Sequence, residues 1–150
     1  MVAILPLLRR LTQTGRQATG GVPRLYRAAR QSGASSREAA AVVATSAAAL
    51  VVAARRAPGR PARQNAVRHF GWQAVLTARH GRTVAAAVAD AQERGSVRLR
   101  DTAVDQRNNA AGQSWGHAHQ AELTSGTAGS ALDRACAAAL QLWEAGELAR

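Results

Sequence analysis

The stretch QNAVRHFGWQAVL, residues 64–76, decides the fold because it combines aliphatic residues with regularly spaced polar and aromatic ones. Four residues of this stretch follow the spacing i, i+4, i+7 and i+11: Asn65, His69, Trp72 and Leu76. At about 3.6 residues per turn, this spacing brings all four to one face of a helix. We therefore predict a helix that displays an amide, an imidazole and an indole together, with Arg68 beside them.

The rest of the chain also favours helices. Its 150 residues are enough for one domain that buries about two thirds of its unfolded surface. Aromatic residues make up 3% of the composition, and the strand-favouring residues never gather into alternating runs. We therefore predict an all-α fold, a single compact bundle of about five to six helices with a basic N-terminal segment.

The net charge of +11 is concentrated at the front of the chain, where residues 1–64 hold eleven arginines and one acid. We divide the chain into a basic, apolar-started N-terminal segment, residues 1–34, and an alanine-rich helical domain, residues 35–150. Arginine pairs with phosphate and releases counterions, so one predicted partner is an anionic membrane surface or a nucleic acid. The other interpretation is a solvated, self-repelling tail. The arginines concerned are Arg9, Arg10, Arg16, Arg24, Arg27 and Arg30.

Two further features concern packing. Ser35 and Glu38 form a predicted capping box ahead of the apolar run from Ala39 to Ala54, which we interpret as a buried central helix rather than a membrane span. Cys136 is the only cysteine, so an intramolecular disulfide is excluded, and its apolar neighbours indicate a buried side chain.

A second polar face is predicted in DTAVDQRNNAAG, residues 101–112. Its carboxylates, carboxamides and glycine recur at helical spacing: Asp101, Asp105, Asn108 or Asn109, and Gly112. If this face meets the face of Asn65 and His69, the two helices enclose an imidazole, carboxylates and amides, with Gln92 and Glu93 available from the helix between them. Such a group suits general acid–base chemistry or metal binding through His and carboxylate.

These motifs, N-x-x-R-H-x-x-W followed by an acidic dipeptide and D-x-x-x-D-x-x-N-N-x-x-G, resemble an uncharacterised bacterial domain family. The family occurs at the C-termini of wall-associated and polymorphic-toxin-like proteins. The resemblance covers about residues 64–116 and implies a site built from Asn65, Arg68, His69, Trp72, Glu93, Asp105, Asn108, Asn109 and Gly112. Two histidines of the family pattern are replaced here, by Gln92 and Arg107. Because glutamine is a poor ligand and arginine cannot coordinate, we predict no metal and no other cofactor.

The first functional hypothesis is a bacterial effector or toxin-like domain, with hydrolysis as its candidate activity. In it His69 is the general base, Asp105 orients the imidazole or stabilises charge, and Glu93 completes the catalytic group. Binding residues are predicted to be Asn65, Arg68, Asn108 and Asn109. The alternative is that these polar residues form a structural network that only fixes the register of the helices, so whether the protein is an enzyme stays open.

Two non-enzymatic hypotheses also stay open. One is an arginine-rich module that binds nucleic acid or an anionic membrane. The other is an accessory subunit, or a protein bound by an immunity-like partner, in which an apolar helix packs on another chain. The apolar run precedes its arginines at the N-terminus, which reverses the order of a Sec signal peptide. Location is therefore open between the bacterial cytoplasm and export without such a signal.

Overall fold

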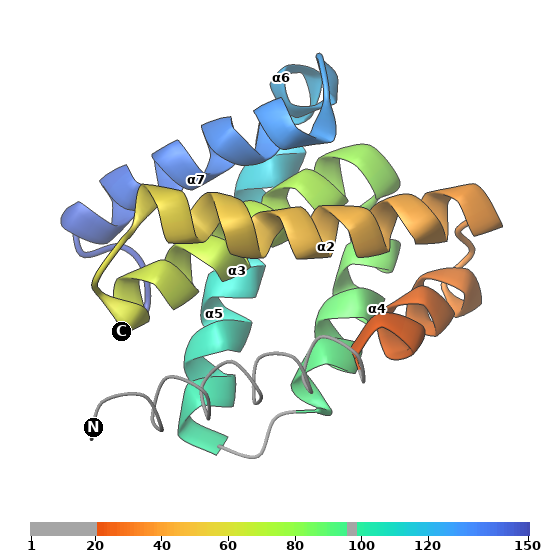
Figure 1. The fold of residues 1–150 in the computed structure, drawn as a ribbon, viewed down its shortest axis with the longest axis horizontal. Helices are drawn as coiled ribbons and strands as arrows, with labels where there is room; N and C mark the ends of the chain where they lie inside the picture. Colours follow the sequence, from red (N-terminus) through yellow and green to blue (C-terminus); the bar gives the residue numbers. More distant parts are fainter. Residues whose placement is uncertain (1–20, 96–98) are drawn as a thin grey trace, which may run out of the picture.

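The computed structural model describes residues 21–95 and 99–150, and within these ranges it is helical without a strand, as predicted (Figure 1). Residues 21–31 form a helical segment ahead of the labelled helices. Those helices are α2 (Ser36–Arg56), α3 (Pro61–His80), α4 (Arg82–Glu93), α5 (Leu99–Ala118), α6 (Gln120–Thr124) and α7 (Ala128–Glu144). The predictions made for Arg9, Arg10 and Arg16 lie outside the described residues.

The described part of the chain contains seven helical segments, residues 21–31 and α2 to α7, which is one more than the upper limit of the predicted five to six. The extra element is α6, which the sequence pattern joined to α5. The two helices separate at His119, whose backbone leaves the helical region with φ −110° and ψ 27°. The His119 ring stacks on Trp115, with ring centroids 3.9 Å apart, and its Nδ1 is hydrogen-bonded to the Trp115 carbonyl oxygen. These contacts hold the chain where it turns from α5 into α6.

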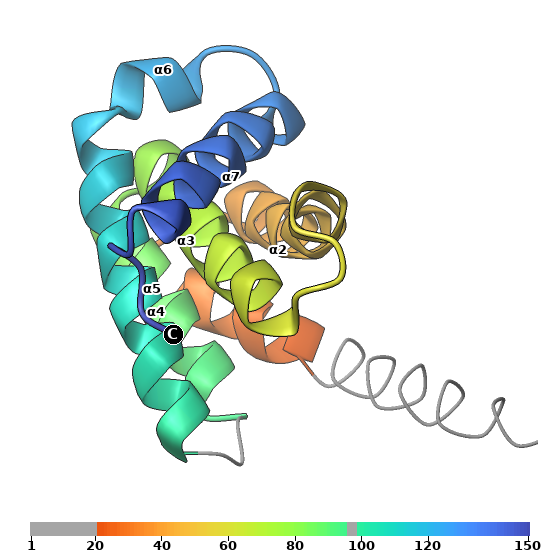
Figure 2. The same ribbon diagram turned by 90° about the vertical axis from the view of Figure 1, so that its left-hand side faces the viewer.

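Helix α3 is the centre of the bundle and packs against each of the helices α2, α4, α5, α6 and α7 (Figure 2). Its residues from Ala66 to Ala78 are buried with the single exception of Arg68, which is partly exposed. The expectation that the apolar run Ala39–Ala54 is the buried central helix is therefore wrong. Alanine buries little area per residue, so the core is organised instead around the larger side chains of α3, such as Phe70 and Leu76.

Helix α2 lies at the side of the bundle and buries one stripe of residues against α3 and α7. Ala39, Val42, Ala49 and Ala53 of this stripe are in the core, whereas Leu50 and Val51 are exposed by 42% and 55%. By length and composition α2 is the one helix of the described ranges that could cross a membrane, and a third of that window is buried in the domain. The spaced burial is the pattern of a helix that packs by one face.

Residues 21–34 are part of the same packed unit. Leu25, Ala28 and Ala29 belong to the hydrophobic core, and Arg30 donates a hydrogen bond to the Ala34 carbonyl oxygen. The capping box at the start of α2 is confirmed: Ser35 Oγ accepts from the Glu38 backbone N–H, and the Glu38 carboxylate accepts from that of Ser35. The described half of the basic front is thus anchored on the bundle.

The sequence also predicts a cap at Thr83 and a capping box of Ser130 with Asp133, and both predictions are wrong. Thr83 does not cap α4, which begins directly after Gly81, and Gly81 has the positive φ of 87° that favours glycine. Helix α7 is capped by Thr127, whose hydroxyl accepts from the Ser130 backbone N–H, rather than by Ser130 with Asp133. Asp133 instead forms a two-bond ion pair with Arg56 at the end of α2. Asp133 is thus engaged by an arginine 77 residues earlier in the chain, which local spacing does not reveal.

Helices α3 and α5 approach each other closely through two glycines. A Cβ atom on Gly112 would overlap the Phe70 carbonyl oxygen, and one on Gly116 would overlap that of Ala74. Residues 70 and 112 and residues 74 and 116 have the same offset along the chain, which means that the two helices run parallel in a fixed register. Only a residue without a side chain permits this backbone contact.

Gly112→Ala is expected to lower the free energy of unfolding by about 1–3 kcal/mol, because the added methyl meets backbone atoms that cannot move aside. The matched control is Gly129→Ala in α7, where the new Cβ would meet nothing closer than Thr127 Oγ1 at 3.9 Å. That change is expected to stabilise the protein by about 0.4–1 kcal/mol. Urea unfolding of the two variants measures both effects, and equal effects would contradict the close contact.

Candidate functional site

The candidate site is a polar cluster, defined here as His69, Glu93 and Asp105, that lies where three helices meet. His69 comes from α3, Glu93 from the last residue of α4 and Asp105 from α5. One nitrogen or oxygen atom of each residue lies within 4.8 Å of those of the other two. The polar faces of α3 and α5 therefore meet, and the predicted position of Glu93 between them is the observed one.

The α3–α5 contact is lined by a ladder of polar pairs, each between a residue and the one 40 positions later. Asn65 Nδ2 donates to Asp105 Oδ1 over 2.6 Å, and His69 Nδ1 donates to Asn109 Oδ1 over 2.8 Å. One turn further, Gln113 Nε2 donates to Gln73 Oε1 over 2.8 Å. The Gln73–Gln113 pair was missed from the sequence, although its spacing of four from the preceding pair was a usable signal.

His69 is buried, and both of its ring nitrogens have partners. Because the Asn109 oxygen can only accept, Nδ1 carries the proton, and Nε2 accepts from Arg68 Nη2 over 2.7 Å. Asp105 Oδ2 lies 3.2 Å from the same Nε2. Burial lowers the pKa of His69 below its usual value, with the Arg68 charge acting in the same direction and Asp105 opposing it. The imidazole is therefore neutral at pH 7.

Arg68 places a positive charge inside the cluster. Its Nη2 also donates to Asn65 Oδ1 over 2.8 Å, which links it to the amide that holds Asp105. Burial lowers the pKa of Arg68, while the nearby carboxylates of Asp105 and Glu93 act against this shift. Arg68 is thus the cation that offsets the two carboxylates.

The two carboxyl groups have opposite properties. Burial alone would raise the pKa of Asp105, but the neighbouring His69 ring, the hydrogen bond from Asn65 and the charge of Arg68 bring it below the usual value. For Glu93, burial and then the charge of Asp105 raise the pKa to about 7. Glu93 Oε1 is also buried and finds no hydrogen-bond partner among the described residues. A pair of carboxyls whose pKa values diverge in this way is typical of acid–base sites.

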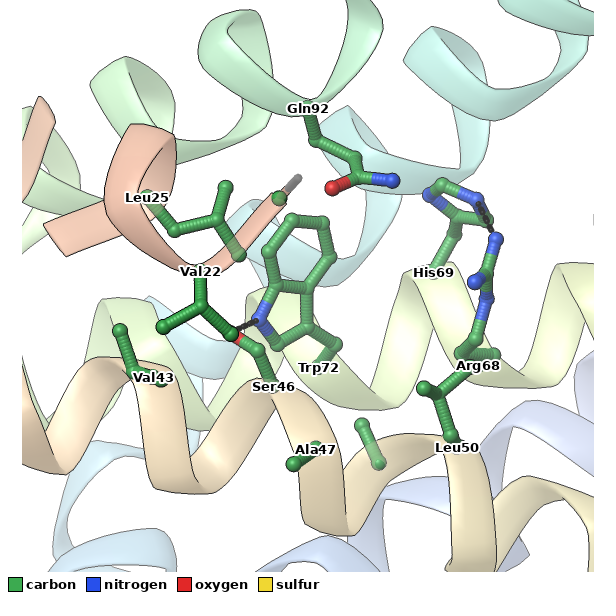
Figure 3. Close-up of a pocket in the computed structure, with 12 residues that line it drawn as sticks. Val22, Leu25, Val43, Ser46, Ala47, Leu50, Arg68, His69, Trp72 and Gln92 are labelled. Carbon is green, nitrogen blue, oxygen red and sulfur yellow. Dashed lines mark hydrogen bonds between the residues drawn. The ribbon is translucent and has the colours of Figure 1, made fainter. Parts of the chain in front are cut away.

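A pocket opens beside the cluster, between the helical segment 21–31 and helices α2, α3 and α4 (Figure 3). Arg68, His69 and Gln92 form its polar end. Its walls are mainly apolar and include Trp72, which is both buried and in contact with the pocket. The Trp72 indole N–H donates to Ser46 Oγ over 2.7 Å, which fixes the ring. No sequence signal connected α2 with this site, because its residues there are apolar except for Ser46.

Asn108 is the one predicted binding residue that lies apart from the cluster. Its Nδ2 donates to the Ala149 carbonyl oxygen over 3.1 Å, and its Oδ1 accepts from the Ala149 backbone N–H over 2.9 Å. This buried amide therefore fastens the end of the chain to α5. Its neighbour Asn109 faces α3 instead, because adjacent residues of a helix point about 100° apart.

The cluster also contains the donors of a metal site. His69, Glu93 and Asp105 form the group of His, Cys, Asp and Glu side chains within the described ranges that could hold a metal ion. A metal cation there would be repelled by the positively charged Arg68 guanidinium, which already forms a hydrogen bond with His69 Nε2. The family histidines replaced by Gln92 and Arg107 add no donor, since Arg107 cannot coordinate.

The described arginines of the basic front are partly engaged in the fold. Arg24 is half-buried and packs against Gly95, and Arg30 holds the Ala34 carbonyl oxygen. Arg27 is exposed and borders a shallow surface depression with Tyr26. Binding of an anionic partner through these side chains stays a prediction.

The chain belongs to the family described as Domain of unknown function (DUF6973), whose match covers residues 34–139. The match includes all members of the cluster and extends beyond residues 64–116, which carry the motifs of the sequence resemblance. No curated protein and no solved structure gives a significant match to the chain. The family assignment agrees with the predicted uncharacterised domain, while the association with toxins stays a prediction.

The wild-type protein is expected to lose stability as the pH rises, and Glu93→Gln is expected to make this loss smaller. The pKa of Glu93 is raised from 4.5 to about 7, so the folded protein keeps a proton that the unfolded chain releases. Stability therefore falls as the pH rises through this window and levels off above it. The charged groups that face Glu93, namely Asp105, Arg68 and Asp90, are the same in both proteins. Urea unfolding at about pH 5 and pH 8 measures the difference, and an unchanged slope would disprove the raised pKa.

Proposed function

We propose that this domain is a small hydrolase of the bacterial effector-like class and that the cluster of His69, Glu93 and Asp105 is its reaction centre. The observation that carries the proposal is the convergence of these three side chains, within 4.8 Å, beside a pocket that His69 and Arg68 line. The effector-like context is supported only by the sequence motifs. A hydrolase needs a group that takes a proton from water, and the cluster offers one.

Glu93 is the group best suited to transfer that proton. Its pKa of about 7 lets it exist in both protonation states at neutral pH, and its buried Oε1 has no partner among the described residues to compete for the proton. In the proposed reaction Glu93 takes a proton from the attacking water and passes it to the departing oxygen. The scissile bond breaks to give an acid and an alcohol, and Glu93 returns to its ionised form.

Asp105 and His69 are proposed to position Glu93 and to set its pKa. The general-base role predicted for His69 needs a free ring nitrogen, but Nδ1 donates to Asn109 and Nε2 accepts from Arg68. His69 can take a proton only if Arg68 withdraws from Nε2. A substrate anion that draws Arg68 toward the pocket would produce this change, so the proposal keeps His69 as a second proton carrier.

Glu93→Gln is expected to lower kcat by about 10²–10⁴, because the amide cannot exchange a proton with water. The probes are 4-nitrophenyl butyrate and bis(4-nitrophenyl) phosphate, which release a coloured product when an ester or a phosphodiester is cleaved. The pH profile of kcat is expected to lose its limb near the Glu93 pKa of about 7. Asp105→Asn is expected to displace this limb rather than remove it.

The matched control is Glu122→Gln in the short helix α6, where the carboxylate is exposed. This variant is expected to keep the full rate and the same pH profile. Thermal unfolding of all variants separates loss of activity from loss of fold. Equal turnover by the wild-type protein and Glu93→Gln, or no turnover of either probe, would overturn the hydrolase proposal.

A further inference from the structure

We propose that the pocket beside the cluster binds the apolar chain of an amphiphilic acyl compound, with its oxygen-bearing head at Arg68 and Gln92. This inference names the substrate class of the reaction centre and rests on the proposed function in that respect alone. The binding of the chain follows from the shape and lining of the pocket.

The lining of the pocket is apolar along its length and polar at one end. Aliphatic and aromatic side chains form its walls, from the helical segment 21–31, α2 and α3: Val22, Leu25, Val43, Ala47, Leu50 and Trp72. In Figure 3, Val22, Leu25 and Val43 lie on one side of the Trp72 ring and Gln92 lies above it. His69 and Arg68 lie on the other side, with Leu50 next to Arg68. A pocket of this kind excludes a sugar or a nucleotide, whose hydroxyls would lose their hydrogen bonds with water.

The size of the pocket matches a chain of moderate length. Its volume is about 190 Å³. An apolar cavity of about 150 Å³ in another protein stays dry and binds benzene. This pocket therefore has room for a short alkyl chain, and water gains little by filling it because the walls offer few hydrogen bonds.

The mouth of the pocket is also apolar. Val22 and Leu50 line the pocket and are exposed by 46% and 42%, so aliphatic side chains are present where the pocket meets solvent. The pocket wall is fixed, because the Trp72 indole is held by Ser46 from α2.

The polar end supplies hydrogen-bond donors for oxygen. The Arg68 guanidinium and the Gln92 amide face the pocket from α3 and α4, and Gln92 precedes Glu93 in the chain. A carbonyl or carboxylate held by these donors comes next to the cluster, where the scissile bond of an ester would lie. The chain thus selects the substrate while the donors align its head.

The test is isothermal titration calorimetry of the full chain with butyrate, hexanoate and octanoate, with acetate as the chainless probe. Each buried methylene contributes about 0.8 kcal/mol, so Kd is expected to fall about fourfold for each methylene added until the pocket is full. Octyl glucoside, which has the chain without an acid head, is expected to bind more weakly than octanoate.

Two variants of α2 provide the matched comparison. Ala47 is exposed and lines the pocket, so Ala47→Phe is expected to weaken octanoate binding at least tenfold. Ala54 is exposed on the same helix outside the pocket, so Ala54→Phe is expected to leave the Kd unchanged. Both positions tolerate a larger side chain because they face solvent, and thermal unfolding verifies this.

The outcomes separate this inference from the hydrolase proposal. A Kd that does not depend on chain length, or equal effects of Ala47→Phe and Ala54→Phe, overturns the acyl pocket even when esters are cleaved. Chain-dependent binding supports the pocket, and if no ester is then cleaved only the hydrolase proposal fails. Cleavage of 4-nitrophenyl esters with a preference for chains that fit the pocket supports both.

Discussion

The backbone contact between α3 and α5 is the constraint on which the rest of the structure depends. Gly112 and Gly116 let the two helices approach to a distance that no side chain would allow. At this distance the side chains of Asn65, His69 and Gln73 reach partners on α5 directly. A buried amide or imidazole without a partner costs about 1–3 kcal/mol, so the close approach and the polar ladder stabilise each other. The glycines bring α3 and α5 close enough for the polar side chains to form hydrogen bonds, and these hydrogen bonds fix the parallel register of the two helices.

The same contact explains why the cluster is electrostatically unusual. Asp105 and Glu93 approach each other inside the bundle, with Arg68 as the near cation. Asp105 has hydrogen bonds and keeps its charge, whereas Glu93 Oε1 finds none among the described residues and its pKa rises to about 7. Glu93 also takes part in a hydrogen bond with Asn109, which lowers its pKa by less than burial raises it. The buried Oε1 atom and the raised pKa of Glu93 are the observations on which the proposed reaction centre rests.

Helix α2 has a second role that its composition conceals. Its alanine-rich surface packs on α3 and α7 by one stripe, and a neighbouring stripe forms a wall of the pocket. Small side chains leave space near Trp72, where larger ones would have filled it. The apolar run that resembles a core or membrane helix thus contributes to the proposed ligand site, and Ser46 within it anchors the indole.

The sequence by itself determined the helical class, the capping box at Ser35, the burial of Cys136 and the existence of two polar helix faces, while their meeting was only a condition. These follow from local rules, because helical periodicity fixes which residues share a face. Only the tertiary structure decided which helix is central, which neighbour takes each polar side chain, and where a pocket remains. Asn108 and Asn109 are adjacent in sequence, yet one holds Ala149 and the other His69. That choice depends on distances between helices, and residue spacing along one helix carries no information about those distances.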